Sequence, residues 1–391
     1  MGRVFLKPGK EKKILNFYPN VYEDDILSFP GEREDGVLTE ICDHEGTFLA
    51  KGYVSVGSSA VVRVLTLSEE KIDGEFFRKK IENAFGRRKE LLKETNCLRA
   101  FYAEADGIPG LIIDWFDGHL SLQFRNGGIE AFRKEILRAA QKVFKAKGIY
   151  EKSDLEIRNR EGAGGKEGLL SGEIPPRILM EDQGVRYAVD IIQGQKTGFF
   201  LDQRDSRRFI RNYITERTAF LDVFSSAGGF SMAALKEGAR KVVAIDKDPY
   251  ALALAGENRE LNGAGGEFVT LEGDALQLLE NLGRKKEKYD IITLDPPALV
   301  KKKADVPKGR DLFYDLCEAS FRLLDKGGIL GVMSCAYYIT LQDLLEVTRM
   351  AASKHQKLLE VIGINYQPKD HPWVLHIPET LYLKALWVRI I

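Results

Sequence analysis

Hydrophobic and polar positions follow a repeating strand and helix rhythm over the C-terminal half of the chain. Short apolar runs rich in β-branched residues end in glycine or polar turns and predict buried strands, and the amphipathic stretches between them predict helices. Strands are predicted at 219–224, 241–245, 266–272, 289–294, 328–333, 357–365 and 382–390, and helices at 203–213, 230–236, 249–262, 310–324 and 341–354. This alternation is typical of a doubly wound α/β sheet, whose ligands bind beyond the carboxyl ends of the strands.

The N-terminal half has a different pattern. Residues 1–66 contain short apolar runs broken by Gly, Pro and Asp, which predict a small strand-rich β-barrel. Helices at 76–94 and 129–146, strands at 98–104, 110–116, 119–124 and 148–151, and a glycine-rich loop at 162–172 then predict an α+β domain. We expect three domains: a β-barrel at 1–67, a central α+β domain at 68–185, and a doubly wound α/β domain at 186–391 that begins with a strand at 187–192.

Composition narrows the function classes. A chain of 391 residues exceeds one compact domain, and 44% hydrophobic with 30% charged residues describes an ordinary soluble protein. Lys+Arg and Asp+Glu both number 58, so any nucleic-acid binding must come from local basic patches. A solvated rim explains any single basic residue near the N-terminus better than a phosphate contact does. The basic residues in question are Lys7, Lys10, Lys12, Lys13, Arg33 and Lys51.

Neither a membrane partner nor a metal is expected. No apolar run approaches the roughly 20 residues of a membrane span, and the basic N-terminus has no apolar signal core, so we expect a cytoplasmic protein. The four cysteines, Cys42, Cys97, Cys317 and Cys335, form no C-x-x-C pair, which disfavours a zinc site and a disulfide framework. A single cysteine can still act as a nucleophile.

The stretch 219–246 carries the most specific local pattern. It predicts a strand, a turn of Ser, Ala and Gly, a helix and a second strand that ends at Asp246, which together form a nucleotide-binding βαβ unit. Asp246 can accept hydrogen bonds from both hydroxyls of a ribose. The turn has neither G-x-G-x-x-G nor a P-loop, so it serves pyrophosphate poorly, whereas Asp222 can face a cationic ligand. S-adenosylmethionine, with its ammonium and sulfonium, is such a ligand, and a βαβ unit without a ligand is the alternative.

Later strands add acids at the same predicted edge. Because the carboxyl ends of parallel strands meet at one side of a sheet, acids that follow successive strands gather there. A single acid would be weak evidence, but four in succession with a cysteine after the next strand are a strong signal. The four acids are Asp222, Asp246, Asp274 and Asp295, and the cysteine is Cys335.

The segment before the sheet supplies a second candidate feature. Asp202 is predicted to be the N-cap of the helix 203–213, and two aromatic residues precede it. Phe199 or Phe200 could stack on an adenine and form the floor of a cofactor pocket. The alternative is that both aromatic side chains belong to the core.

With these residues in place, the chain resembles the PUA-domain-containing large-subunit ribosomal RNA cytosine-5 methyltransferases, which have the Class I S-adenosylmethionine-dependent fold. The matching stretches are DGIPGLIID from Asp106, EKSD from Glu151, GQKTGFFLDQRDSR from Gly194, FSSAGGFS from Phe224, LDPPALVKKK from Leu294, SCAYY from Ser334 and HPWVLHIPETLYLKAL from His371. The resemblance implies a PUA barrel, a central α+β domain and a methyltransferase domain. It also implies S-adenosyl-L-methionine as cofactor, large-subunit ribosomal RNA as partner and, as is frequent in the family, a homodimer.

The resemblance assigns the catalytic roles. Cys335 is the thiolate that adds to carbon 6 of the cytosine, and Asp295 holds the edge of the unstacked base. Other RNA cytosine-5 enzymes carry a second Cys after an Asp-Pro motif, but Ala298 follows Pro297 here, so Cys335 must act alone. Residues 301–303 are all lysine and could hold phosphates, and a solvated loop explains them equally well.

The resemblance also assigns the cofactor site. Asp246 takes the ribose hydroxyls, Asp274 takes the adenine amino group, and Asp222 with residues 224–228 takes the methionine end. The cofactor-binding residues expected are Thr197, Phe199, Phe200, Gln203, Arg204, Asp222, Phe224, Ser225, Gly228, Asp246, Lys247, Asp274, Ala275 and Asp295.

Three other functions stay open at this point. A methyltransferase that acts on guanine or on an amino group would use the same cofactor and the same Asp-Pro-Pro, but it would not need Cys335. A dehydrogenase is disfavoured by the missing G-x-G-x-x-G. A catalytically silent RNA-binding protein would keep the barrel but should have lost the acids at the strand ends, and this chain has them all.

Overall fold

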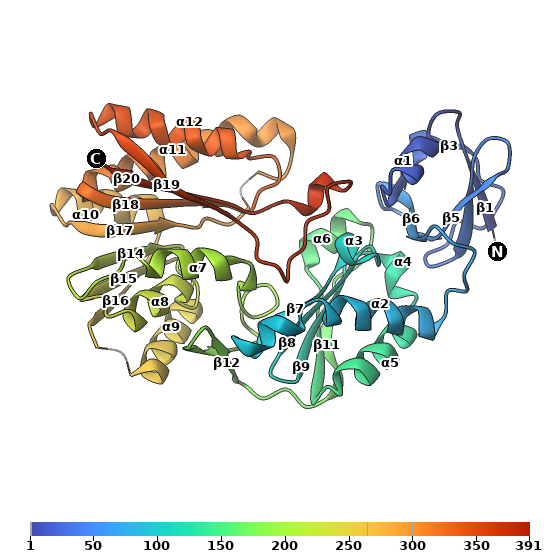
Figure 1. Cartoon of the computed structure of the whole chain (residues 1–391), viewed down its shortest axis with the longest axis horizontal. Coiled ribbons are helices and arrows are strands. Elements are labelled where there is room, and N and C mark those ends of the chain that lie inside the picture. Colours follow the sequence, from blue (N-terminus) through green and yellow to red (C-terminus); the bar gives the residue numbers. More distant parts are fainter. Residues whose placement is uncertain (1, 264, 299) are drawn as a thin grey trace. The chain divides into compact units, whose positions relative to one another are not determined.

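The computed structural model describes residues 2–263, 265–298 and 300–391. The chain divides into two compact units (Figure 1). Unit 1 contains Met1–Met180, Val189–Phe199 and Lys369–Thr380, and unit 2 contains Glu181–Ala188, Phe200–Pro368 and Leu381–Ile391. Each unit is therefore built from segments that lie far apart in the sequence.

The first sheet of unit 1 has six strands in the order β2-β6-β5-β4-β1-β3. The pair β1 and β4 is parallel, and the other neighbours are antiparallel. The elements are β1 (Gly2–Leu6), α1 (Glu11–Leu15), β2 (Asn20–Tyr22), η1 (Glu23–Asp25), β3 (Ile26–Ser28), β4 (Leu38–Cys42), β5 (Phe48–Val54) and β6 (Ala60–Thr66). Alternate residues such as Val4 and Leu6 of β1 are buried in one small core. The strand-rich N-terminal domain predicted from the sequence is confirmed.

The second sheet of unit 1 has five strands in the order β11-β10-β9-β8-β7 and packs with the helix pair α2 and α5. The elements are α2 (Gly74–Gly86), η2 (Lys89–Lys93), β7 (Cys97–Tyr102), α3 (Ala103–Asp106), β8 (Leu111–Phe116), β9 (His119–Phe124), α4 (Gly127–Glu130), α5 (Arg133–Phe144), β10 (Gly148–Lys152), α6 (Leu155–Arg160) and β11 (Glu167–Gly172). This arrangement confirms the α+β prediction. Tyr53 of β5 belongs to the same core, and its hydroxyl donates to the carbonyl of Pro109 at 2.7 Å.

The prediction of a loop at 162–172 is wrong in its second half. β11 (Glu167–Gly172) pairs antiparallel with β10, for example through Tyr150 and Leu169. Only one neighbour supports β11, so its side chains stay largely exposed and the sequence there is polar and glycine-rich. An edge strand held by its backbone lacks the apolar alternation that predicts a strand.

Unit 2 is built around a seven-stranded sheet with the order β16-β15-β14-β17-β18-β20-β19. The first five strands are parallel, and β20 is antiparallel to both β18 and β19. The strands are β14 (Ala219–Val223), β15 (Lys241–Asp246), β16 (Glu267–Glu272), β17 (Tyr289–Leu294), β18 (Leu324–Ser334), β19 (Leu359–Tyr366) and β20 (Lys384–Ile390). Since the strand order reverses between β14 and β17, the sheet has a topological switch point there, and the predicted doubly wound sheet is confirmed.

Helices cover both faces of this sheet (Figure 1). The helical elements of unit 2 are η3 (Leu201–Gln203), α7 (Arg204–Arg211), α8 (Gly229–Lys236), α9 (Pro249–Asn262), α10 (Ala275–Arg284), η4 (Lys303–Asp305), α11 (Val306–Leu323) and α12 (Leu341–Lys354), and η5 (Pro378–Thr380) belongs to unit 1. Leu221 and Val223 of β14 share a core with α10, α11 and α12. Helices α8 and α9 pack on the other face, against β14 and β15. Both faces are therefore buried, which explains the nearly continuous apolar runs of the parallel strands.

The N-cap predicted at Asp202 is wrong. Helix α7 begins at Arg204, its N-cap is Gln203, and no side chain caps it. Asp202 lies one residue earlier, in η3, and its carboxylate accepts a hydrogen bond from the hydroxyl of Tyr382 at 2.7 Å. A contact with a residue 180 positions away thus takes the side chain that local sequence assigns to the helix end.

The strand expected at 187–192 begins and ends earlier in the structure, and a second strand precedes it. β12 (Ile178–Asp182) and β13 (Val185–Val189) form a two-stranded sheet, whereas a single strand was expected at 187–192. Asp190 ends β13, because its Oδ1 accepts from the backbone N–H groups of Ile192 and Gln193 at 2.8 Å each. None of the helices in the described part of the chain is both long and apolar enough for a membrane crossing.

Candidate active site at the carboxyl edge of the sheet

The predicted strand-end acids meet at one edge of the unit 2 sheet. Val223 at the end of β14 pairs with Leu294 of β17 and with Ile245 of β15, so Asp246 and Asp295 follow neighbouring positions. Asp274 comes after β16 and is the N-cap of α10. These placements put the predicted acids beside the switch point between β14 and β17, where doubly wound sheets bind ligands.

The turn between β14 and α8 has a strained backbone. Phe224 and Ser226 have φ values of 64° and 48°, which side-chain-bearing residues adopt rarely, and Gly228 has φ 78°. A Cβ at Gly228 would lie 3.1 Å from the Cβ of Ala255, so this position needs glycine for both its conformation and its space. Strain of this kind persists where the surrounding structure holds it, and it is concentrated at ligand sites.

Asp246 holds this turn in place. Its Oδ2 accepts from the backbone N–H of Ser226 at 2.8 Å, and its Oδ1 accepts from the backbone N–H of Asp248 at 3.0 Å. A carboxylate has about four acceptor positions, so about two remain for a ligand. Two is the number that a pair of ribose hydroxyls requires.

Asp222 is buried under the turn rather than aimed at open solvent. Its Oδ2 accepts from the N–H and the hydroxyl of Ser231 at 2.9 and 2.6 Å, and its Oδ1 accepts from the hydroxyl of Thr293 at 3.1 Å. Burial raises the pKa of the Asp222 carboxyl to about 6, although these hydrogen bonds oppose the shift. Asp222 therefore ties the start of α8 to β14 and β17.

Asp295 is bound to the segment before the sheet. The side-chain amide of Gln203 donates to its Oδ1 at 2.9 Å. Burial, together with the negative charges of Asp202 and Asp222, raises the pKa of the Asp295 carboxyl to about 8. The shift favours the protonated carboxyl, which can both donate and accept a hydrogen bond.

Two buried polar atoms around these acids have no partner among the described residues. They are the Oγ of Ser225, in the turn after β14, and the Oε1 of Gln203, on the same amide that binds Asp295. A buried polar group without a hydrogen bond is costly, and in a native protein it often marks the place of a ligand or water. The donor and acceptor character of this edge thus fits a polar nucleoside such as S-adenosylmethionine.

The remaining residues expected at the cofactor differ in their surroundings. Asp274 is exposed, and its Oδ1 accepts from the backbone N–H of Gln277 at 3.0 Å. Ala275 is buried as the first residue of α10, and Lys247 is exposed directly after Asp246. Phe200 is half-buried in unit 2.

Three residues that were expected to bind the cofactor are buried within the protein. Arg204 is buried, and its Nε donates to Asp182 at 2.8 Å. Thr197 and Phe199 are buried in unit 1, and the hydroxyl of Thr197 donates to Asp114 at 2.6 Å. The structure therefore gathers the other expected residues in unit 2 but leaves Thr197 and Phe199 in unit 1.

Cys335 follows the end of β18, the strand next to β17. Leu294 pairs with Val332, so Asp295 and Cys335 leave adjacent strands at the same edge. The other three cysteines of the chain are buried, whereas Cys335 is partly exposed. The sequence analysis missed Lys384, which pairs with Ser334, the residue before Cys335, because pairing between β18 and β20 has no local signal.

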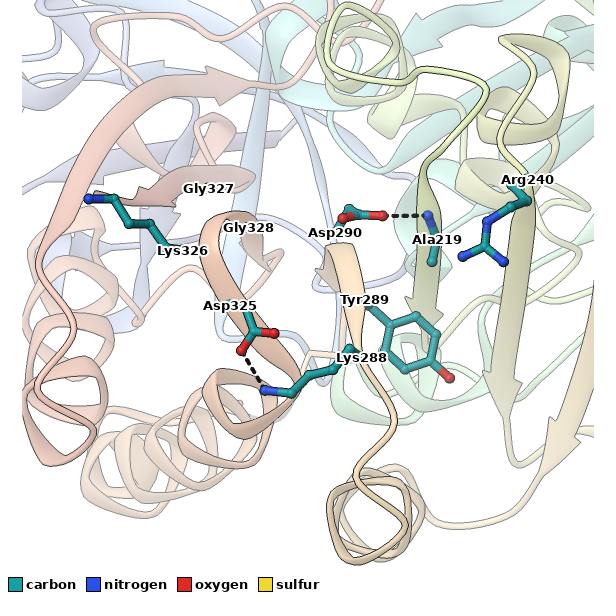
Figure 2. Close-up of a pocket in the computed structure, with 9 residues that line it drawn as sticks. All are labelled: Ala219, Arg240, Lys288, Tyr289, Asp290, Asp325, Lys326, Gly327 and Gly328. Atoms are coloured by element: carbon teal, nitrogen blue, oxygen red, sulfur yellow. Dashed lines mark hydrogen bonds and ion pairs between the residues drawn. The ribbon is translucent and has the colours of Figure 1, made fainter.

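A hollow at the opposite edge of the sheet is formed by other residues (Figure 2). Its lining residues are Ala219, Arg240, Lys288, Tyr289, Asp290, Asp325, Lys326, Gly327 and Gly328. Ala219 and Tyr289 begin β14 and β17, so this hollow lies at the amino ends of the strands. Asp290 accepts from the backbone N–H of Ala219 at 2.8 Å, and Lys288 is paired with Asp325 at 2.5 Å. None of the residues expected in the active site lines it.

Fold and site together define a Class I S-adenosylmethionine-dependent methyltransferase. Residues 108–372 match the S-adenosylmethionine-dependent methyltransferase family, and residues 4–67 match a PUA-like domain. The chain belongs to the family of the ribosomal RNA large subunit methyltransferase I proteins. It is 35% identical over 396 residues to such a protein from Shigella dysenteriae, covering 100% of this chain and 99% of that one. It is also 35% identical over 395 residues to one from Citrobacter koseri, covering 99% of each.

Solved structures agree on the fold. A candidate S-adenosylmethionine-dependent methyltransferase from Streptococcus mutans superimposes with a TM-score of 0.85 at 22% identity, over 100% of both chains. A second structure with the same TM-score, identity and coverage was crystallised in complex with SAH. The chain is thus an S-adenosylmethionine-dependent methyltransferase with an N-terminal PUA-like domain.

Proposed function

We propose that this enzyme forms 5-methylcytosine in large-subunit ribosomal RNA and that Cys335 is its nucleophile. The observation that carries the proposal is the position of Cys335. It is a partly exposed thiol at the carboxyl edge, one strand from Asp295, in a chain whose other cysteines are buried. The relatives named as ribosomal RNA large subunit methyltransferase I support the substrate class.

The chemistry of cytosine explains why a thiolate is needed. Carbon 5 is a poor nucleophile until Cys335 adds to carbon 6, which moves the electrons of the 5,6 double bond onto carbon 5. When bound, S-adenosylmethionine supplies the electrophilic methyl group. Loss of the proton from carbon 5 to a base then lets the carbon–sulfur bond break, which restores the double bond and frees the thiolate.

Asp295 suits the polar edge of cytosine. That edge presents a ring nitrogen that accepts and an amino group that donates, and a protonated carboxyl can serve both at once. A proton donated to the ring nitrogen also draws electrons from carbon 6 and favours addition of the thiolate. The raised pKa of Asp295, about 8, supports this role because it keeps the proton on the carboxyl at neutral pH.

The cofactor assignments remain part of the proposal. Asp246 takes the ribose hydroxyls, Asp274 the adenine amino group, and residues 224–228 the methionine end, where the Ser225 hydroxyl has no partner among the described residues. Asp222 holds this turn from below through Ser231. The other proposed contacts are Phe200, Gln203, Arg204, Lys247, Ala275 and Asp295.

In this proposal each of the three domains has its own role. Residues 1–67 bind RNA, residues 68–185 form the central domain, and residues 186–391 carry the cofactor and the chemistry. A PUA-like match at 4–67 supports the first assignment. We also propose a cytoplasmic location, where ribosomal RNA is available, and a homodimer.

Covalent trapping tests the nucleophile. In RNA that carries 5-fluorocytosine, fluorine replaces the hydrogen on carbon 5. The final proton loss is then blocked, so enzyme and RNA stay joined through Cys335. A denaturing gel with cofactor present should show a shifted band for the wild type and none for Cys335→Ala. Cys317→Ala, which changes a fully buried cysteine, is the matched control and should still be trapped. Methyl transfer that persists in Cys335→Ala would refute the proposal and indicate methylation of guanine or of an amino group.

A further inference from the structure

Lys384 lies directly across the sheet from the residue before the proposed nucleophile. It is the first residue of β20 and pairs with Ser334, the last residue of β18. Its side chain is only 5% exposed. Its Nζ donates to the carbonyl oxygen of Ala336 at 2.7 Å and to that of Tyr382 at 2.8 Å. Lys384 is therefore anchored on both sides of Cys335: its backbone pairs with Ser334, and its ammonium donates to the carbonyl of Ala336.

The ammonium has no carboxylate within ion-pair distance among the described residues. The ionisable groups that act on it are Cys335, after β18, and Asp343, on α12. The oxygens of Asp343 are already bonded, Oδ1 to Arg310 at 2.6 Å and Oδ2 to the hydroxyl of Thr340 at 2.6 Å. Two neutral carbonyls do not neutralise a buried positive charge, so the environment favours a negative group beside it.

We propose that Lys384 is a positioning residue that stabilises the thiolate of Cys335 and fixes the backbone turn that presents it to the base. This inference rests on the proposed function, in which Cys335 is the nucleophile. The thiol proton leaves to solvent, the sulfur keeps the electron pair, and the ammonium keeps its three protons. Lys384 thus acts on the reaction through Cys335 and need not touch the base.

The electrostatics agree with this geometry. Burial lowers the pKa of Lys384 to about 8, and the negative charges of Cys335 and Asp343 oppose that shift. The ammonium form therefore predominates at neutral pH. The interaction is mutual: a thiolate that favours the protonated form of Lys384 is itself favoured by that form, and a cation nearby makes a thiol more acidic.

Alkylation of the intact protein tests the proposal without RNA. Cys335 is the partly exposed cysteine, so its reaction with iodoacetamide, localised by mass spectrometry, can be followed as a function of pH. The wild-type midpoint should lie below the ordinary thiol value of about 8.5. It should rise by about one pH unit in Lys384→Met and stay within about half a unit of wild type in Lys384→Arg, since a nearby opposite charge shifts a pKa by about that much or more.

Each outcome decides the question. A wild-type midpoint at or above 8.5 would overturn the proposal even if the Met variant failed to fold. Equal midpoints for wild type and Lys384→Met, or an Arg variant that titrates like the Met variant, would overturn it as well. Covalent trapping with 5-fluorocytosine RNA separates the two ideas. If the wild type is trapped but its alkylation midpoint equals that of Lys384→Met, only the role of Lys384 is refuted. If the midpoints differ but no trapping occurs, cytosine-5 chemistry is refuted and the coupling of Lys384 to Cys335 stands.

Discussion

Replacement of Asp246 by alanine should weaken S-adenosylmethionine binding by about 1.5–3 kcal/mol, which is about 10- to 150-fold in Kd. The structure gives the reason for this range. Asp246 uses two of its acceptor positions on the backbone N–H groups of Ser226 and Asp248, at 2.8 and 3.0 Å. The alanine variant would lose the two remaining positions that the ribose requires, and it would also release a turn that contains two strained residues.

Calorimetry with matched variants makes this test specific. Asp246→Asn keeps the size and one acceptor oxygen, so its loss of affinity should fall between those of the wild type and the alanine variant. Asp290→Ala is the control, because Asp290 also accepts a backbone N–H, that of Ala219 at the start of β14, but lies at the opposite edge of the sheet (Figure 2). Its Kd should equal that of the wild type. An Asp246→Ala protein that is folded and binds the cofactor within twofold of wild type would refute the ribose assignment.

Three further outcomes are expected. The folded-state pKa of Asp222 is raised from 3.8 to about 6, so its contribution to stability is fully present below about pH 4 and is lost as the pH rises through about 6. The wild type should therefore lose up to about 3 kcal/mol of unfolding free energy over this interval relative to Asp222→Asn, which does not titrate there. Urea unfolding measures both pH profiles, and parallel profiles would contradict this. Gly331→Ala places a Cβ 2.3 Å from the Trp387 ring and should lower the stability by about 1–3 kcal/mol, whereas Gly256→Ala, with no atom within 4 Å, should raise it by up to about 1 kcal/mol. Lys12→Gln, an exposed change in α1, should leave RNA affinity and its salt dependence unchanged, because a solvated rim explains this single residue better than a phosphate contact; a loss of about 0.7 in logarithmic slope in a filter-binding assay would contradict this.

The doubly wound sheet could be predicted from the sequence because most of its strands contain a short apolar run that ends in a polar turn. Asp246 and Asp295 were placed by the same logic, since an acid after a parallel strand must lie at the carboxyl edge. The helix at 275–284 was missed, although Asp274 is its N-cap, because the acid was considered only as a ligand. One residue can both cap a helix and bind a ligand, and a local sequence pattern does not say which of the two roles it has.

Contacts between distant residues explain the remaining misses. The carboxylate of Asp202 accepts a hydrogen bond from the hydroxyl of Tyr382 instead of capping α7, and the neighbouring sequence does not imply this partner. Lys384 was missed for the same reason, because its importance comes from strand pairing with Ser334, 50 residues earlier in the chain.

The position of β20 between β18 and β19 has a consequence for the order of folding. β19 is synthesised before β20, and in the described part of the chain it pairs with β20 alone, so it cannot join the sheet until the later strand has been inserted. Until then, β18 presents an open edge, which is a site for mispairing with other chains. Since long-range pairing of this kind forms slowly, insertion of β20 is expected to be a late event. The same event brings Lys384 opposite Ser334, so in the proposal above the Cys335 thiol gains its cationic neighbour only after β20 has been inserted.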